Sequence, residues 1–244
     1  MFNQSINIKP AKLYYAGNDL GLTFSEDKIS YKIWSPPAQS AFIEIYADAQ
    51  GSKKLDEYEL QSAYSDTWQV ELPQKYYGKY YRLKLRLPRK EYNFVDPWAK
   101  AVGTNSEYGL IVDPSRIYPP SWTHDQKVKL EDPVDAVIYE LHVKDFSASR
   151  ESGIRQKGKY TAFTEKHSVN KEGMLTGIAH LKELGVTHVH LLPVYDFASV
   201  DDTDSDDYNW GYDPLYYMVP EGSYATNPAN ESRIYEFKKM VKAL

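Results

Sequence analysis

The stretch from Tyr81 to Leu87, Tyr-Arg-Leu-Lys-Leu-Arg-Leu, alternates apolar and basic residues. Successive side chains of a β-strand point to opposite faces, so this alternation predicts a strand with one buried face and one solvated face. Pro88 follows immediately and ends the pattern, because proline has no N–H to donate to a sheet. The stretch therefore predicts a β-rich region with a core on one side.

The sequence on the N-terminal side of this stretch has the same character. Short apolar runs are separated by turn-forming residues and show little helical periodicity, a spacing typical of a β-sandwich. The predicted strands are Tyr31 to Trp34, Phe42 to Ala47 and Thr67 to Leu72, and the breaks between them are Pro36-Pro37, Gly51-Ser52 and Pro73. We place this all-β domain at residues 1–118.

A proline-rich, irregular stretch follows, and we place the connecting segment at residues 119–133. It contains Pro119-Pro120 and Asp132-Pro133, which do not favour regular structure. Aromatic residues such as Tyr118 and Trp122 accompany the prolines. We therefore expect this segment to pack against its neighbours and not to act as a free linker.

Residues 134–244 change to an alternating strand and helix pattern. Ala136 to Val143 and Val186 to Val194 are predicted strands, and Gly173 to Leu184 is a predicted helix with Leu175, Ile178, Leu181 and Leu184 on one face. A second helix is indicated by Ile234, Phe237, Val241 and Leu244, opened by Asn227-Pro228 or by Asn230. This order predicts parallel strand pairing. Two strands and two helices do not complete a barrel, so the pattern is typical of the beginning of a larger α/β fold.

Composition excludes several function classes. Lys and Arg number 29 against 34 Asp and Glu, for a net charge of -5, and no basic stripe suits a nucleic acid. No apolar run resembles a membrane span or a signal peptide, so we expect no membrane partner and a cytoplasmic location. The chain has no cysteine, which removes thiol nucleophiles and cysteine-based zinc sites. The 22 Tyr and 5 Trp suit either sugar binding or the packing of a β-rich core.

The predicted loop from Tyr195 to Asn227 is the main candidate site. It follows the second predicted strand, so in a parallel α/β fold it lies at the carboxyl edge of the sheet, where active sites are built. It contains Asn209, Trp210, Tyr212 and Asp213. Aromatic rings beside amide and carboxylate groups can hold a sugar and bind its hydroxyls. The alternative is that Trp210 and Tyr212 only pin the loop to the rim of the sheet.

Other polar groups carry no comparable signal. Asp202, Asp204 and Asp206 have the spacing of a calcium loop, but Asp207 stands where a glycine is needed, so we expect a solvated acidic loop and leave calcium open. His188 and His190 share one strand face without an evident third ligand, so we expect histidines of a core or barrel lining and no metal. We interpret Glu140 and His142 as residues with satisfied interior hydrogen bonds. No cofactor motif is present.

Several motifs resemble those of a known family. Phe24 and Ile33-Trp34-Ser35-Pro36, with Asp96-Pro97-Trp98-Ala99-Lys100-Ala101-Val102, are similar to the opening and closing motifs of family 48 carbohydrate-binding modules, with Trp98 in place of the usual Tyr. Val137 to Ser147 and Leu184 to Val194 resemble the first two barrel strands of glycoside hydrolase family 13. The segment Tyr208-Asn209-Trp210-Gly211-Tyr212-Asp213-Pro214, followed by Pro220 to Ala225, resembles type I pullulanases most specifically.

The resemblance implies both a fold and an activity. The fold is an immunoglobulin-like sandwich at 1–118 followed by the first β/α units of a (β/α)8 TIM barrel at 134–244. The activity is hydrolysis of α-1,6-glucosidic bonds in pullulan, glycogen or limit dextrin by a retaining mechanism with two carboxylates. Tyr212 is then expected to stack beneath a glucose, and Asp213 to support the site or bind the sugar. The family's catalytic carboxylate motifs do not occur in this chain, so we expect no catalytic residue here and expect the remainder of the polypeptide as a partner.

Two alternatives remain at this stage. One is a non-catalytic α-glucan-binding protein that uses only the sandwich, although such a protein does not need residues 136–244. The other is an isoamylase or branching-type enzyme of the same superfamily, which the Tyr208 to Pro214 segment argues against.

Overall fold

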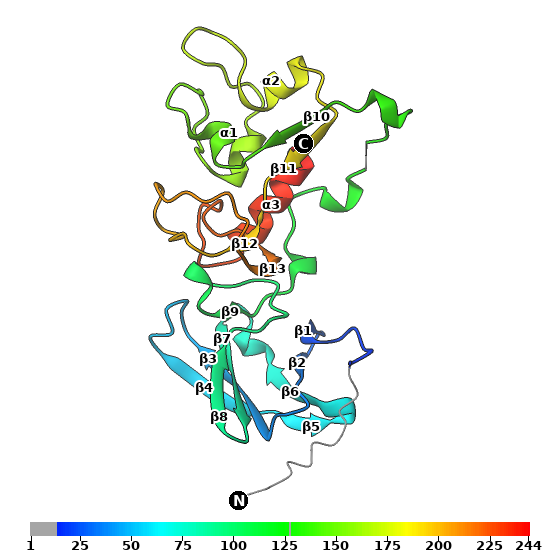
Figure 1. Cartoon of the computed structure of the whole chain (residues 1–244), viewed down its shortest axis with the longest axis vertical. Helices are drawn as coiled ribbons and strands as arrows, with labels where there is room; N and C mark the ends of the chain where they lie inside the picture. Colours follow the sequence, from blue (N-terminus) through cyan, green and yellow to red (C-terminus); the bar gives the residue numbers. More distant parts are fainter. Residues whose placement is uncertain (1–13, 127) are drawn as a thin grey trace, which may run out of the picture.

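The computed structural model describes residues 14–126 and 128–244; the first 13 residues of the predicted sandwich domain therefore lie outside the described part. Figure 1 shows two parts along the long axis of the molecule, a β-sandwich near the N-terminus and a mixed α/β segment at the other end. Within the described residues, no helix has the length and apolar character needed to span a lipid bilayer.

The sandwich consists of two antiparallel sheets. One has the order β1 (Gly21–Phe24), β2 (Lys28–Trp34), β6 (Thr67–Pro73) and β5 (Gln61–Ala63). The other has the order β4 (Lys54–Glu59), β3 (Ser40–Tyr46), β7 (Tyr80–Leu87) and β8 (Lys90–Phe94), with β9 (Gly109–Leu110) also paired to β7. The four strands predicted from the sequence are confirmed as β2, β3, β6 and β7.

The core of the sandwich follows from the period-two pattern. Alternate residues of β2, including Ile29 and Tyr31, are buried against Ile43 and Ile45 of β3 and against Leu83 of β7. The basic residues between the leucines of β7 lie on the other face and are partly or fully exposed. The two sheets thus close one apolar cluster between them.

The α/β segment contains the predicted parallel pair. β10 (Ile138–Leu141) pairs in parallel with β11 (His188–Leu191), in the register that places Ile138 opposite His188. Its helices are α1 (Asp145–Ala148), α2 (Gly177–Glu183) and α3 (Ser232–Ala243). The order strand, helix, strand, helix is therefore confirmed.

Helix α2 is shorter than the prediction of Gly173 to Leu184. Leu175 forms a β-bridge with Val169, which holds the chain extended until the helix begins at Gly177. Ile178 and Leu181 are buried as predicted, but Leu175 and Leu184 are exposed. The helical spacing identified the middle of the helix and not its ends.

The prediction of a continuous loop from Tyr195 to Asn227 is also corrected. β12 (Tyr195–Phe197) and β13 (Pro214–Pro220) form an antiparallel pair within it, with irregular register at both steps along β12. The two strands bring the ends of residues 198–213 together. Short 3-10 turns complete the described structure at Tyr64–Asp66, Gln74–Tyr76, Thr104–Ser106, Pro114–Arg116, Trp122–His124, Pro133–Asp135 and Tyr160–Thr164.

The stretch that leaves the sandwich packs against α3. Ala101, Tyr108 and Ile117 share one apolar cluster with Ile234. Lys238 Nζ donates to the carbonyls of Pro114 and Ile117 at 2.6 and 2.7 Å, and Lys242 donates to the carbonyl of Pro120. The chain beyond the sandwich is therefore fixed to the α/β segment by apolar contacts and by hydrogen bonds from two lysines of α3 to backbone carbonyls.

Candidate functional site

Residues 198–213, here called the aromatic loop, present three exposed rings, of which Trp210 and Tyr212 are the most exposed. The side chains of Trp210 and Tyr212 are 60% and 68% exposed. Beside them lies an open depression of about 510 Å³, lined by Ser199, Tyr208, Asn209, Trp210, Tyr212 and Asp213. Neither ring is buried, and the Trp210 Nε1–H donates to the Tyr208 hydroxyl at 3.1 Å, so Trp210 also makes a contact within the loop.

Asn209 and Asp213 shape the loop from within. The Asn209 amide donates to the Ala198 carbonyl and to Asp213 Oδ1, both at 2.9 Å, and accepts from the Gly211 N–H. Gly211 has a φ of +88°, and a Cβ there would lie 2.8 Å from Phe197. These contacts hold the backbone on both sides of the exposed rings. The structure brings all four predicted site residues to one depression, and sugar contact by them stays a prediction.

His142 of the β10 end supports the loop from below, as the interpretation of a satisfied interior residue requires. Its Nδ1 accepts from the Asp145 N–H at 3.3 Å, which places the proton of the neutral ring on Nε2. Nε2 lies 2.9 Å from the Asn209 carbonyl and 2.8 Å from the Tyr224 hydroxyl. The Tyr208 ring lies 5.0 Å from the imidazole, and its hydroxyl donates to Asp145. Tyr208 and His142 therefore anchor this side of the loop.

A buried ionic network lies under the other side. Arg233 of α3 is fully buried and pairs with Asp196 of β12 at 3.0 Å and with Asp202 at 3.1 Å. Ser106 Oγ donates to Asp196 at 2.6 Å. Burial raises the pKa of Asp196, and Arg233 and Ser106 oppose that rise. In the described part of the chain, the Arg233 Nε–H is the one donor of this guanidinium without an acceptor.

Glu221 lies beside this network. Its carboxylate accepts from the Ser223 N–H at 2.7 Å and from the Phe197 N–H at 3.1 Å. Burial, together with the nearby Asp202 carboxylate, raises the pKa of Glu221 to about 7. A glutamic acid that changes charge near neutral pH therefore connects the start of the aromatic loop to the turn after β13.

Several sequence predictions require correction. Asp202 is buried in the Arg233 ion pair and is not part of a solvated acidic loop. His188 and His190 are exposed and not in a core, and Glu140 is also exposed and pairs with His190 Nδ1 at 3.2 Å. No group of three His, Asp or Glu residues within 14–126 and 128–244 has an arrangement that could hold a metal ion.

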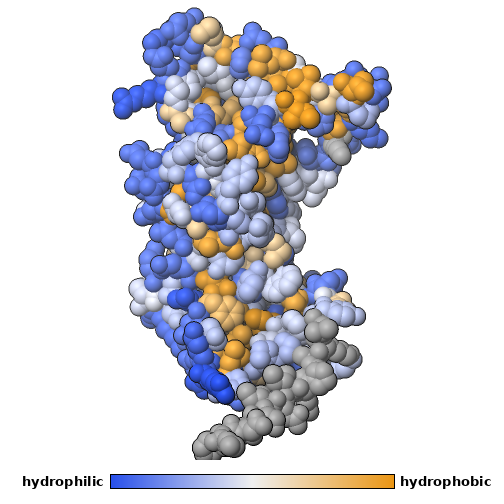
Figure 2. Space-filling view, viewed as in Figure 1, coloured by the Kyte–Doolittle hydropathy of each residue, from blue (hydrophilic) through white to orange (hydrophobic). Residues whose placement is uncertain are grey.

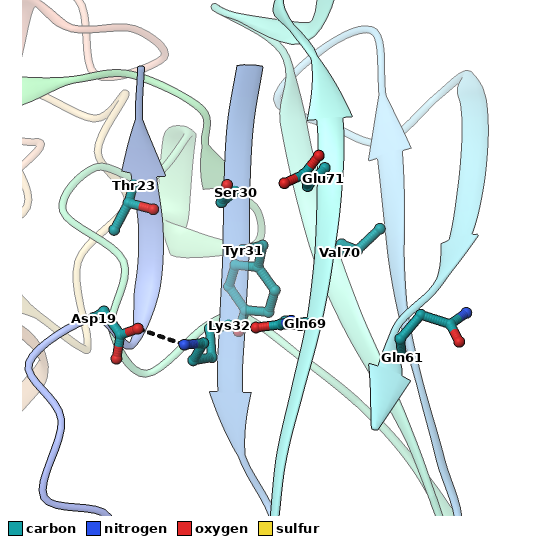
Figure 3. Close-up of a pocket in the computed structure, with 9 residues that line it drawn as sticks. All are labelled: Asp19, Thr23, Ser30, Tyr31, Lys32, Gln61, Gln69, Val70 and Glu71. Carbon is teal, nitrogen blue, oxygen red and sulfur yellow. Dashed lines mark hydrogen bonds and ion pairs between the residues drawn. The ribbon is translucent and has the colours of Figure 1, made fainter. Parts of the chain in front are cut away.

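A second depression, of about 400 Å³, lies on the outer face of the β1-β2-β6-β5 sheet. Figure 3 shows its polar residues, among them Thr23, Lys32, Gln69 and Glu71, with Lys32 paired to Asp19. Tyr31, the aromatic residue among those that line it, is fully buried in the core. The described lining of this depression therefore offers hydrogen bonds and no exposed ring.

The buried network was missed by sequence reasoning. Arg233 was not a candidate because it lies in a segment selected for its apolar residues, and Asp196 was not singled out within the predicted loop from Tyr195 to Asn227. One signal was available: Arg233 precedes Phe237, Met240 and Leu244 by four, seven and eleven residues and so shares their helical face. A charged residue in that phase must be paired when the face is buried.

Several known proteins are similar to this chain in sequence and in overall fold. Residues 19–99 match the family described as Carbohydrate-binding module 48 (Isoamylase N-terminal domain). The sandwich of this chain is therefore similar to a module of this kind, and a mixed α/β segment follows it.

Over nearly its whole length the chain matches the N-terminal region of pullulanases. It is 39% identical over 235 residues to a pullulanase of Bacillus subtilis (strain 168), covering 96% of this chain and 32% of that protein. A crystal structure of the Paenibacillus barengoltzii pullulanase in complex with maltohexaose and α-cyclodextrin has a TM-score of 0.90 and 40% identity, covering 94% of this chain and 36% of that one.

The Bacillus acidopullulyticus pullulanase also gives a TM-score of 0.90 with 40% identity, covering 97% of this chain and 29% of that one. The chain thus spans about a third of the length of the pullulanases that it matches.

Proposed function

We propose that this chain is the N-terminal portion of a debranching glycoside hydrolase that cleaves α-1,6-glucosidic bonds in pullulan, glycogen or limit dextrin. In this proposal residues 1–118 are an immunoglobulin-like carbohydrate-binding module, and residues 134–244 begin a (β/α)8 barrel. Residues 119–133 form the segment that connects the two. The higher identity to a pullulanase, 39% against 27% to an isoamylase, supports this assignment over an isoamylase.

The observation that supports the proposal is the pair of exposed rings, Trp210 and Tyr212, on a loop whose base is held by hydrogen bonds and ion pairs. An exposed tyrosine on a rigid loop can stack on the apolar face of a glucose ring without first paying the entropy of ordering the loop. Tyr212 is exposed beside the depression, and Asn209 and Asp213 hold the backbone around it. We assign Tyr212 as the stacking platform and Trp210 as a neighbouring sugar contact.

The reaction itself is assigned to the remainder of the polypeptide. A retaining mechanism requires a nucleophile and an acid/base carboxyl about 5 to 5.5 Å apart, both open to the sugar. Asp196 and Glu221 are buried below the loop, and Asp213 is bonded to Asn209. These three carboxyls have structural partners and do not supply such a pair.

The apolar surface of the α/β segment supports a partner there. Ile138 of β10 is 67% exposed, and Val134, Val137 and Leu184 are exposed nearby. Figure 2 shows apolar residues gathered over the end of the molecule that carries β10 and β11. Patches of this kind mark sites where another surface docks, and we assign this one to the remaining strands of the barrel.

The test is a pair of substitutions in the enzyme reconstituted by co-expression with the downstream segment of the same gene. Tyr212→Ala should lower kcat/KM on pullulan by about 10- to 100-fold, because the lost contact is made with the reacting sugar. Tyr217→Ala is the matched control, since Tyr217 is similarly exposed but lies on β13, outside the depression. Equal activity of Tyr212→Ala and the control would refute the platform. Absence of pullulan hydrolysis by the reconstituted parent would refute the debranching function.

The match of residues 19–99 favours a second candidate function, α-glucan binding by the sandwich without catalysis. The polar depression of Figure 3 is the described surface with hydrogen-bonding groups for it. Calorimetric titration of residues 1–129 with maltoheptaose tests this candidate. Binding that Lys32→Ala and Gln69→Ala weaken would support it, and no heat at millimolar sugar would exclude it.

A further inference from the structure

The turn between β8 and β9 of the sandwich has an uncommon backbone. Asn105 and Ser106 both have positive φ values, 54° and 57°. Two consecutive non-glycine residues in the left-handed region are unfavourable on their own, so their surroundings must hold them there. The polar contacts of this turn explain how they are held.

Each of the two residues is bonded to the base of the aromatic loop. The Asn105 N–H donates to Asp202 Oδ2, and the Asp202 N–H donates back to Asn105 Oδ1, both at 2.8 Å. Ser106 Oγ lies 2.6 and 2.7 Å from the two Asp196 oxygens. The turn therefore contacts both acidic residues at the loop base through short, buried or half-buried hydrogen bonds.

Arg233 joins these contacts at one guanidinium. Beyond Asp196 and Asp202, it donates to the carbonyls of Gly103 at 2.9 Å, Pro220 at 3.2 Å and Pro228 at 2.9 Å. The turn before β9, strand β12, the first part of the aromatic loop, the end of β13 and the segment before α3 therefore meet on one side chain. Because bidentate and multiple charge-assisted bonds fix direction as well as distance, this arrangement sets the relative position of these segments.

Hydrogen bonds of Ala198 connect Asp196 to the residues beside the exposed rings. The Ala198 N–H donates to the Asp213 carbonyl, and the Ala198 carbonyl accepts from the Asn209 amide, both at 2.9 Å. Asn209 and Asp213 stand directly beside Trp210 and Tyr212. Two residues of backbone therefore separate the ionic network from the groups that shape the tip of the loop.

We propose that Arg233, Asn105 and Ser106 are positioning residues that clamp the base of the aromatic loop to the turn between β8 and β9 of the β-sandwich, so that the sandwich supports the sugar platform. The clamp stands on contacts within this chain. Only its importance for a sugar rests on the proposed function above.

The chain offers a matched pair of variants to test the clamp. Asn105→Gly with Ser106→Gly keeps the left-handed backbone, which glycine adopts freely, and removes the side-chain bonds to Asp202 and Asp196. Ser65→Gly with Asp66→Gly is the control, because Ser65 and Asp66 form another left-handed pair, with φ values of 60° and 59°, in a sandwich turn. Both variants leave Arg233 in place, so neither exposes an unpaired buried charge.

The measurement is hydrogen exchange, followed by mass spectrometry, on the monomeric fraction of the 244-residue chain. The Asn105→Gly/Ser106→Gly variant should make amides of residues 197–213 exchange about 10- to 100-fold faster, as expected for losing the part-buried Asn105–Asp202 and the buried Ser106–Asp196 side-chain hydrogen bonds. Peptides of β2 and β3 should keep parental rates, which a general loss of folding would not allow. The control should change exchange only around residues 64–67. Parental exchange in residues 197–213 of the first variant would overturn the proposal, as would equal acceleration in the control.

A second measurement separates this clamp from a purely structural role. In the reconstituted enzyme the Asn105→Gly/Ser106→Gly variant should lower kcat on pullulan about tenfold with KM within about twofold, since a displaced ring misaligns the sugar in the transition state. Unchanged kcat beside faster loop exchange would overturn the positioning role. If the reconstituted parent hydrolyses no pullulan, the proposed function fails, and the exchange result alone decides the clamp.

Discussion

The two parts of the molecule have strands of similar residues, but these residues are buried in one part and exposed in the other. In the sandwich, Ile43 of β3 is fully buried, and alternate residues of β2 and β3 face the opposite sheet. In the α/β segment, β10 carries the same kind of residues, yet Ile138 is 67% exposed and Tyr139 is also exposed. Within the described residues, β10 and β11 form a two-stranded sheet. The same residue types therefore stabilise a strand only where a second surface covers them.

The largest expected effect is the difference in stability between the two parts when each is expressed as a separate fragment. Residues 1–129 should fold alone and melt cooperatively, because their two sheets bury one another. Residues 134–244 should not fold stably, because the apolar faces and free edges of β10 and β11 remain exposed to water. Each Å² of apolar area left exposed loses about 25 cal/mol of stabilisation. Circular dichroism melts and light scattering of each fragment check this. A cooperative, monomeric melt of residues 134–244 would remove the contrast.

The next prediction compares one isoleucine from each part. Ile43→Ala should lower the free energy of unfolding by about 2–5 kcal/mol, because it leaves a cavity in a closed core. Ile138→Ala should change it by less than about 0.5 kcal/mol, because its side chain is largely exposed. Urea denaturation of the monomeric chain measures both values. A large loss from Ile138→Ala would show that β10 is covered in solution.

A smaller effect concerns the pH dependence of the α/β segment. Because the pKa of Glu221 is raised from 4.5 to about 7, the folded chain keeps a proton that the unfolded chain releases between these values. Stability should therefore fall as the pH rises from about 4.5 to 7 and level off above it, by at most on the order of 3 kcal/mol.

The test is urea denaturation at pH 5 and pH 8. Glu221→Gln should lose most of this pH dependence, whereas the surface substitution Glu71→Gln should keep the parental slope. A parental slope in Glu221→Gln would assign the pH dependence to other groups, of which Asp196, with its raised pKa, is the nearest in this network.

The sequence predicted the parts of the fold that follow from local pattern. The strands with a buried alternate face were identified because their period of two is visible in the residues. Lys90–Phe94 was missed because four of its five side chains are exposed and so show no alternation. The β12 and β13 pair was missed because its irregular register and two prolines hide the pattern.

The candidate site divides in the same way. The exposed rings and glycine of the aromatic loop were evident as a local cluster. The network below it was not, because Ser106, Asp196 and Arg233 are distant in sequence and meet only in the folded chain. Sequence pattern reports which residues face a core. It does not report which buried charges will be paired with one another.

The contact between Arg233 and the Gly103 carbonyl spans 130 residues, and this has a consequence for how the protein is made. At a synthesis rate of about 5–20 residues per second, Arg233 is added roughly 6–26 s after Gly103. The strands of the sandwich leave the ribosome during that interval and can pair at once. The left-handed turn at Asn105 and Ser106 has to wait for its partners, so the nascent chain carries paired sandwich strands up to β8 and an unformed turn before β9 until α3 emerges.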